Sequence, residues 1–125
     1  MALNLLLLAA AGAVGTLARY GLTSLTERVA PEGSAWGSIV VNVLGSCVFG
    51  LALAAAEERA HLDAQDRLII LTGLLGAFTT FSTFAGEIGR YMHAGAFVTA
   101  GLHLLLTNAL GVGAFLLGYS LLSRS

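Results

Sequence analysis

The sequence contains no lysine, one proline and one cysteine, and charged residues make up only 10% of its 125 residues. A single cysteine, Cys47, excludes an intrachain disulfide and a dithiol redox motif. The formal net charge of −1 comes without a basic tail or patch, so we expect no nucleic-acid partner. The histidines lack metal-ligand spacing and no paired carboxylates fall within an apolar segment, so we also expect no enzymatic activity.

The chain is instead rich in hydrophobic residues, which make up 57% of it. This composition lies far from that of a soluble domain, so we expect membrane lipid to be its solvent. A helix needs roughly 20 mostly apolar residues to cross the hydrocarbon core. We therefore predict an all-α membrane protein with one integral membrane domain, residues 1–125, and four spans at about 2–25, 36–56, 66–93 and 96–122.

Two of these spans carry polar residues on one helical face. In the second span Ser38, Asn42 and Ser46 occur at every fourth position, and in the fourth span His103 and Thr107 do the same. A buried asparagine must find hydrogen-bond partners or it costs free energy. Asn42 is therefore either a clamp between helices or an amide that faces a ligand.

The third span has the least helical composition at membrane depth. Glycines lower its helix propensity, and hydroxyl side chains compete with the backbone for hydrogen bonds. Irregular backbone at this depth is tolerated only where protein buries it or where it lines a wet cavity. We therefore predict a break in the third helix, and a site there, within a segment of three phenylalanines and four hydroxyls: Phe78, Phe81, Phe84, Thr79, Thr80, Ser82 and Thr83.

The charged residues near the span ends suggest local roles. Arg19 lies inside the first span, where it is either an interfacial anchor or a structural or anion-attracting residue. Asp63 and Asp66 suit the start of the third helix, since their carboxylates meet unpaired backbone N–H groups. Glu87 and Arg90 are three residues apart and could pair across a helical turn.

The arginines give almost no orientation bias. With four spans, the N-terminus, the second loop and the C-terminus share one side of the membrane. That side holds three arginines, Arg59, Arg67 and Arg124. The other side holds Arg28 and Arg90, and Arg19 as well if its side chain reaches the interface. This balance favours dual insertion and an antiparallel homodimer with its two-fold axis in the membrane plane, the alternative being a single orientation set by other factors.

Three segments together resemble the CrcB/Fluc family of fluoride channels: Gly76-Ala-Phe-Thr-Thr-Phe-Ser-Thr-Phe84, Gly15-Thr-Leu-Ala-Arg-Tyr20 and Gly37-Ser-Ile-Val-Val-Asn-Val-Leu-Gly45. The resemblance covers essentially the whole chain in size, span number and motif order. It implies an antiparallel dual-topology homodimer in a prokaryotic plasma or inner membrane. Such a dimer would passively export fluoride from the cytoplasm through two pores and hold a structural sodium ion at its centre.

The resemblance also implies roles for individual residues. Phe81 and Phe84 match the phenylalanines whose ring edges face the anion, and Asn42 matches a pore asparagine. Gly76 and Thr79 match the break whose backbone carbonyls coordinate sodium. The remaining matches are hydroxyl or ring donors along the pore and an arginine near its vestibule: Ser38, Thr80, Ser82, Thr83, His103, Thr107 and Arg19.

His103 departs from the resemblance, because the family often has tyrosine there. Neutral imidazole can donate one hydrogen bond, but protonation near its reference pKa of about 6.5 would place a charge in the pore. We therefore hypothesise that conduction depends on pH, the alternative being a histidine that only packs.

The main alternative function is a proton-coupled small-solute or drug exporter of the small multidrug resistance type. Such proteins need a carboxylate deep in the first span, and residues 2–25 contain none. A proton-coupled fluoride antiporter is a nearer alternative, for which only Glu87 and His103 are available as proton carriers. A helix bundle without transport gives no reason for the hydroxyl-rich segment.

Overall fold

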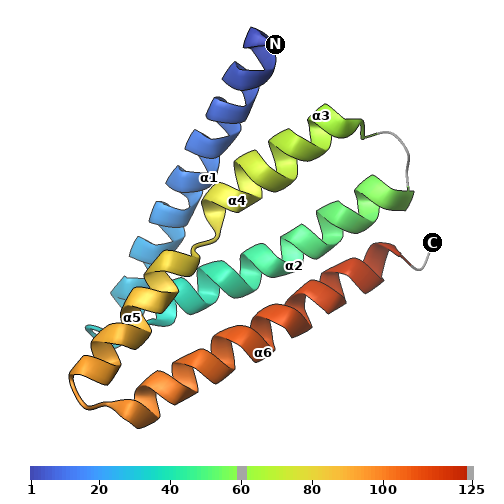
Figure 1. Cartoon of the computed structure of the whole chain (residues 1–125). Helices are drawn as coiled ribbons and strands as arrows, with labels where there is room; N and C mark the ends of the chain where they lie inside the picture. The colour runs from blue at the N-terminus through green and yellow to red at the C-terminus, as the bar shows by residue number, and fades with distance from the viewer. Residues whose placement is uncertain (59–61, 124–125) are drawn as a thin grey trace.

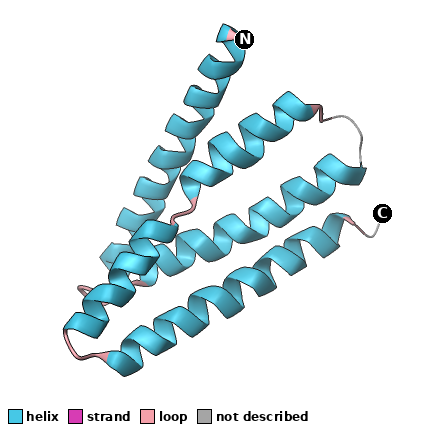
Figure 2. Cartoon of the chain, in the orientation of Figure 1, coloured by secondary structure: helices cyan, strands magenta, loops and turns pink. Residues whose placement is uncertain are grey.

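The computed structural model describes residues 1–58 and 62–123, and two arginines used in the orientation count, Arg59 and Arg124, lie outside them. The described residues form helices joined by short connections, without a strand (Figure 2). The helices are α1 (Ala2–Val29), α2 (Trp36–Glu58), α3 (Ala64–Arg67), η1 (Leu68–Leu75), α4 (Gly76–Phe78), α5 (Phe81–His93) and α6 (Phe97–Leu122).

Four helical segments in the described part of the chain are long and apolar enough to cross a membrane, which confirms the all-α, four-span prediction. They are α1, α2, the composite segment Ala64–His93 and α6. The first continues past its predicted end at residue 25 to Val29, and the second continues past 56 to Glu58.

The spans alternate in direction (Figure 1). Helix α1 and the composite third span run one way, whereas α2 and α6 run the other way. The start of α1 and the ends of α2 and α6 therefore lie at one end of the bundle. The α5–α6 connection and the start of α2 lie at the opposite end, where Gly95 supplies a backbone with φ 75°.

Helices α2 and α6 form the most extensive contact between helices, and small residues allow it. A Cβ on Gly50 would overlap the carbonyl oxygen of Phe115, and one on Gly118 would overlap the carbonyl oxygen of Cys47. Glycine at both positions thus brings the two backbones into direct contact. This close contact fixes the polar faces of α2 and α6 next to each other.

The third span begins as predicted and then changes its winding. Asp63 is the N-cap of α3, and its side chain accepts hydrogen bonds of 2.8 Å from the backbone N–H groups of Gln65 and Asp66. The following segment η1 is a π-helix, whose hydrogen bonds join residues five apart. No pattern in the sequence predicted this winding.

Helix α1 packs against η1 through a single buried residue. Gly15 is the only buried residue in α1, and a Cβ there would overlap the carbonyl oxygen of Leu74 and lie 3.2 Å from the Cβ of Ala77. The leucines of α1 are mostly exposed, so this helix offers a largely apolar surface to its surroundings. The α1–η1 contact therefore depends on the absence of a side chain at Gly15.

We predict that Gly15→Ala destabilises the fold by about 1–3 kcal/mol, because the added methyl group overpacks the contact with η1. Gly12→Ala is the matched control, since a Cβ at Gly12 would lie 3.9 Å from its nearest neighbour, the carbonyl oxygen of Gly73. Thermal unfolding in detergent, followed by circular dichroism, measures both variants. Equal melting temperatures for the two variants would contradict the prediction.

Candidate functional site

The helical winding of the third span is interrupted between α4 and α5. Thr79 has φ −80° and ψ 161°, and Thr80 has φ −148° and ψ 112°, so both residues have extended backbone. Thr80 is the N-cap of α5, where its Oγ1 accepts a hydrogen bond of 3.3 Å from the backbone N–H of Thr83. Two residues of irregular backbone thus lie in the middle of an apolar span, and their polar groups need partners.

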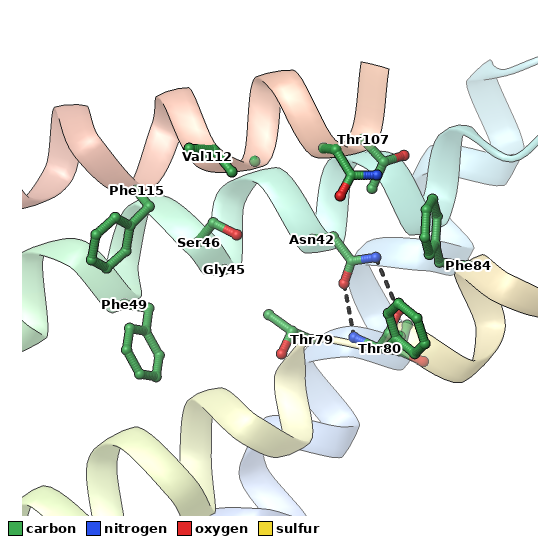
Figure 3. Close-up of a pocket in the computed structure, with 13 residues that line it drawn as sticks. Asn42, Gly45, Ser46, Phe49, Thr79, Thr80, Phe84, Thr107, Val112 and Phe115 are labelled. Carbon is green, nitrogen blue, oxygen red and sulfur yellow. Dashed lines mark hydrogen bonds between the residues drawn. The ribbon is translucent and has the colours of Figure 1, made fainter. Parts of the chain in front are cut away.

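Asn42 of α2 supplies those partners (Figure 3). Its Nδ2 donates to the Thr80 carbonyl oxygen at 3.0 Å, and its Oδ1 accepts from the Thr80 backbone N–H at 2.8 Å. A Cβ on Gly45, one turn further along α2, would overlap the Thr79 side chain. Asn42 is therefore a clamp on the backbone, and its second amide hydrogen is left for another acceptor.

The interruption also redirects the partners of two carbonyls. In a continuous helix the carbonyl of Gly76 would accept from the N–H of Thr80, and that of Thr79 from the N–H of Thr83. These N–H groups donate instead to Asn42 Oδ1 and Thr80 Oγ1. The carbonyls of Gly76 and Thr79 are thus freed from helical bonding, and carbonyl oxygen is a ligand type that hard cations prefer.

A cavity of about 440 Å³, here called the phenylalanine cavity, lies between α2, the α4–α5 junction and α6 (Figure 3). At this cavity Phe84 is 6% exposed and Phe81 is 78% exposed, with ring centroids 5.7 Å apart. The polar residues that line it are Asn42, Ser46, Thr79, Thr80, Thr107 and Asn108. The cavity therefore combines ring edges with amide and hydroxyl donors.

A second cavity of about 400 Å³, here called the arginine cavity, lies on the other side of Thr80, which lines both cavities. It contains two arginines and two glutamates among hydroxyl side chains, and Arg19 is partly buried there. The charged and polar lining residues are Arg19, Arg90, Glu27, Glu87, Thr16, Tyr20, Thr23, Ser34, Ser38 and Thr83. This placement favours a site role for Arg19 over a purely interfacial one.

Four side chains form a hydrogen-bonded series across the wall between the two cavities, here called the polar chain. The Ser38 hydroxyl donates to Glu87 Oε2, and His103 Nε2 lies 3.0 Å from the same oxygen. Thr107 Oγ1 lies 3.2 Å from His103 Nδ1. Ser38 and Glu87 line the arginine cavity, whereas Thr107 lines the phenylalanine cavity, so the polar chain links them.

Glu87 and Arg90 do not form the ion pair that their spacing in the sequence suggested. Among the described residues, the side chain that contacts the Glu87 carboxylate from α6 is His103, whose Nε2 lies 3.0 Å from Glu87 Oε2. The two polar faces of α2 and α6 were visible in the sequence, but the side of α5 that meets them depends on where α5 begins. Glu87 was named from the sequence as a proton carrier of the alternative antiporter. It was not predicted as a pore residue, because its register is set by the Thr79–Thr80 interruption.

The structure does not bring every predicted site residue to a cavity. Asn42, Phe81, Phe84, Thr80 and Thr107 line the phenylalanine cavity. Ser38, Thr83 and Arg19 line the arginine cavity. His103 is buried between the cavities, whereas Ser82 is exposed on α5 and lines neither of them.

Comparison with known proteins identifies relatives over most of the chain. Residues 6–119 match the family model described as CrcB-like protein, Camphor Resistance (CrcB). The fluoride-specific ion channel FluC of Nitrosococcus oceani is 43% identical over 114 residues, which cover 91% of each chain. The FluC proteins of Nitratidesulfovibrio vulgaris and Vibrio campbellii are 45% and 40% identical, covering 86% and 94% of this chain and 90% and 93% of theirs.

We predict that Asn42→Ala exposes the Thr80 amide to exchange, because both hydrogen bonds that hold this residue are lost. A buried polar group left without a partner costs about 1–3 kcal/mol, so amide hydrogen exchange at Thr80 should accelerate about tenfold or more. Asn108→Ala is the matched control, since Asn108 bonds only the Leu104 carbonyl of its own helix. Equal Thr80 exchange rates in the two variants would contradict the clamp.

Proposed function

The chain belongs to the CrcB family, and we propose that it is a fluoride-specific ion channel that conducts fluoride passively across the membrane it spans. The observation that carries this proposal is the match of residues 6–119 to the family model. Relatives that are named fluoride-specific ion channels also align with this chain over about nine tenths of their length. The chain is accordingly a transport protein and not an enzyme. The two cavities and the polar chain between them give the proposed ion path its physical basis.

The phenylalanine cavity suits a small anion. The edge of an aromatic ring carries partial positive charge, so Phe81 and Phe84 attract fluoride without a full cation that would hold it too tightly for conduction. The second amide hydrogen of Asn42 adds a hydrogen-bond donor in the same cavity, and the Thr107 hydroxyl, which is hydrogen-bonded to His103, also lines it. Fluoride leaving water is thus offered replacements for its hydration shell.

The arginine cavity is the proposed vestibule. Arg19 and Arg90 raise the local concentration of anions there, while Glu27 and Glu87 keep the cavity from binding them permanently. From this vestibule the hydroxyls of Ser38 and Thr83 lead toward Thr80, which lines both cavities. His103 and Thr107 continue the polar chain to the phenylalanine cavity. Ser82 contributes only if a second copy of the chain covers it.

We further propose that the channel is an antiparallel homodimer with two pores. Phe81 is 78% exposed at the mouth of a polar cavity, and α1 buries only Gly15 within its own chain. An inverted second copy would cover these surfaces and enclose the cavities from lipid. The nearly equal arginine counts on the two sides support insertion in both orientations.

The proposed dimer holds a structural sodium ion at its centre. The carbonyls of Gly76 and Thr79 fit such a role, because the N–H groups that would pair with them in a helix bond elsewhere. Bound sodium would supply positive charge that neutralises these carbonyl dipoles. The residues of this chain hold the carbonyls in place through the Asn42 clamp on Thr80.

The proposed location is a prokaryotic plasma or inner membrane, where the channel lets fluoride leave the cytoplasm down its gradient. A drug exporter of the small multidrug resistance type is not favoured, because residues 2–25 contain no carboxylate. The relatives named as fluoride channels favour the channel as well.

We predict that purified protein in liposomes loaded with potassium fluoride releases fluoride rapidly when valinomycin is added, with little chloride release in a parallel assay. Phe81→Ile and Phe84→Ile should each lower the fluoride flux about tenfold or more, because isoleucine lacks the positive ring edge. Phe97→Ile is the control, since Phe97 is exposed at the start of α6 and lines neither cavity. Undiminished flux in both site variants would remove the rings from the mechanism, and the absence of fluoride release from folded wild-type protein would overturn the channel.

We also predict that a reporter fused to the C-terminus is found on both sides of the membrane in comparable amounts. Adding three lysines to the C-terminus should shift the population toward one side, because positive charge is retained in the cytoplasm. A reporter found on only one side in the unmodified protein would contradict dual insertion.

A further inference from the structure

His103 joins Glu87 to Thr107 in the polar chain, and its surroundings constrain its protonation chemistry. The residue is 4% exposed. The rings of Phe84 and Tyr91 stand nearly perpendicular to the imidazole, with centroid distances of 5.2 and 6.2 Å and interplanar angles of 70° and 88°. These contacts hold the ring plane, so its two nitrogens keep their separate partners.

The partners determine which nitrogen carries the hydrogen in the neutral ring. When Glu87 is ionised, its carboxylate only accepts hydrogen bonds, and His103 Nε2 is then the donor to it. A neutral imidazole has one N–H, and Nδ1 is then an acceptor. The Thr107 hydroxyl must therefore donate its only hydrogen to Nδ1, and it shows the phenylalanine cavity an oxygen lone pair.

Protonation of the ring reverses the direction of the hydrogen bond between His103 Nδ1 and Thr107 Oγ1, which is the last bond of the polar chain. Both nitrogens of an imidazolium are donors, so Nδ1 then donates to the Thr107 oxygen. The Thr107 hydrogen is released and can turn into the phenylalanine cavity, where it donates to an anion. The added positive charge also cancels that of the Glu87 carboxylate, which otherwise repels an anion in the low dielectric of the membrane.

We propose that His103 is a proton-controlled positioning residue, which turns the Thr107 hydroxyl from an acceptor into a donor toward the phenylalanine cavity and so raises fluoride conduction under acidic conditions. This inference rests on the proposed channel function. The acidic form of His103 favours the anion path in two ways, through the freed hydroxyl and through the neutralised carboxylate.

The other ionisable groups around the ring do not provide the same switch. From α5, Glu87 and Tyr91 face His103, and from α2 only the Ser38 hydroxyl reaches it, through the shared Glu87 oxygen. Arg19, Glu27 and Arg90 line the arginine cavity on the far side of Glu87. Imidazole is the side-chain type that ordinarily titrates between about pH 5 and about pH 8, and among the described residues at this point His103 is the one that carries it.

The test is fluoride flux from liposomes at several values between about pH 5 and about pH 8, the range in which imidazole ordinarily titrates. Release from protein-free liposomes at each pH is subtracted to remove permeation of hydrogen fluoride. We expect the wild-type fluoride flux to rise about tenfold toward the acidic end of this range. A rise of this size corresponds to the free energy of about one hydrogen bond to a charged group. His103→Gln, which remains neutral, should keep the low flux of the neutral form at every pH.

Three further variants separate positioning from packing. His103→Tyr offers a hydroxyl to Glu87 but no acceptor to Thr107, so its flux should be high at every pH. Thr107→Val should abolish the rise by removing the freed donor, and Thr107→Ser should restore it. His93→Gln is the control for histidine loss and should retain the wild-type pH profile, because His93 is exposed at the end of α5.

A spectroscopic measurement tests the hydrogen-bond directions without transport. The nitrogen NMR signals assigned to His103 by comparison with His103→Gln should show hydrogen on Nε2 at neutral pH and on both nitrogens at acidic pH. Hydrogen on Nδ1 of the neutral ring would overturn the proposal. So would a wild-type fluoride flux independent of pH, or a pH profile that persists in His103→Gln. Absence of fluoride flux at every pH would instead overturn the channel function on which the proposal rests.

Discussion

Asn42 gives the extended backbone between α4 and α5 the hydrogen bonds that a continuous helix would have supplied from within. Its amide both donates to and accepts from Thr80, so one side chain satisfies two backbone groups at membrane depth. Without such a partner each of these groups would cost free energy in an apolar surrounding. The clamp also fixes the residue at which α5 begins. Because the start of a helix sets which side chains lie on each face, Phe84 and Glu87 face α6.

The polar groups inside this bundle are tolerable because they are placed on one connected surface. The close contact of α2 and α6 at Gly50 and Gly118 puts their polar faces side by side. Glu87 then completes the series, since its carboxylate is shared by Ser38 and His103. A carboxylate in a span is costly unless it is paired. The same pairing that lowers this cost makes the path sensitive to the charge of one histidine.

Local patterns were enough to predict the spans, the start of the third helix at Asp63 and the polar faces of α2 and α6. Apolar length, capping residues and period-four spacing are properties of neighbouring residues, so the sequence contains them directly. The partner of Glu87 was not predictable in this way. The i, i+3 spacing to Arg90 indicated a local pair, but the contact across helices to His103 depends on the turn lost at Thr79 and Thr80 and on the π-helix before them.

The distribution of burial supports the proposal that the working assembly contains a second copy of the chain. Within a single chain the driving force for helix association in lipid is close packing, and α2 and α6 satisfy it. Helix α1 packs closely against η1 at Gly15, but its leucines are mostly exposed, so most of its apolar surface has no partner within the described part of the chain. Phe81, beside a cavity lined by amides and hydroxyls, is 78% exposed, so lipid would reach polar groups that need donors and acceptors. The proposed second copy would cover the ring and the leucines of α1 and would close the cavity from lipid. The exposed face of the third span is thus the surface on which the proposed pore depends.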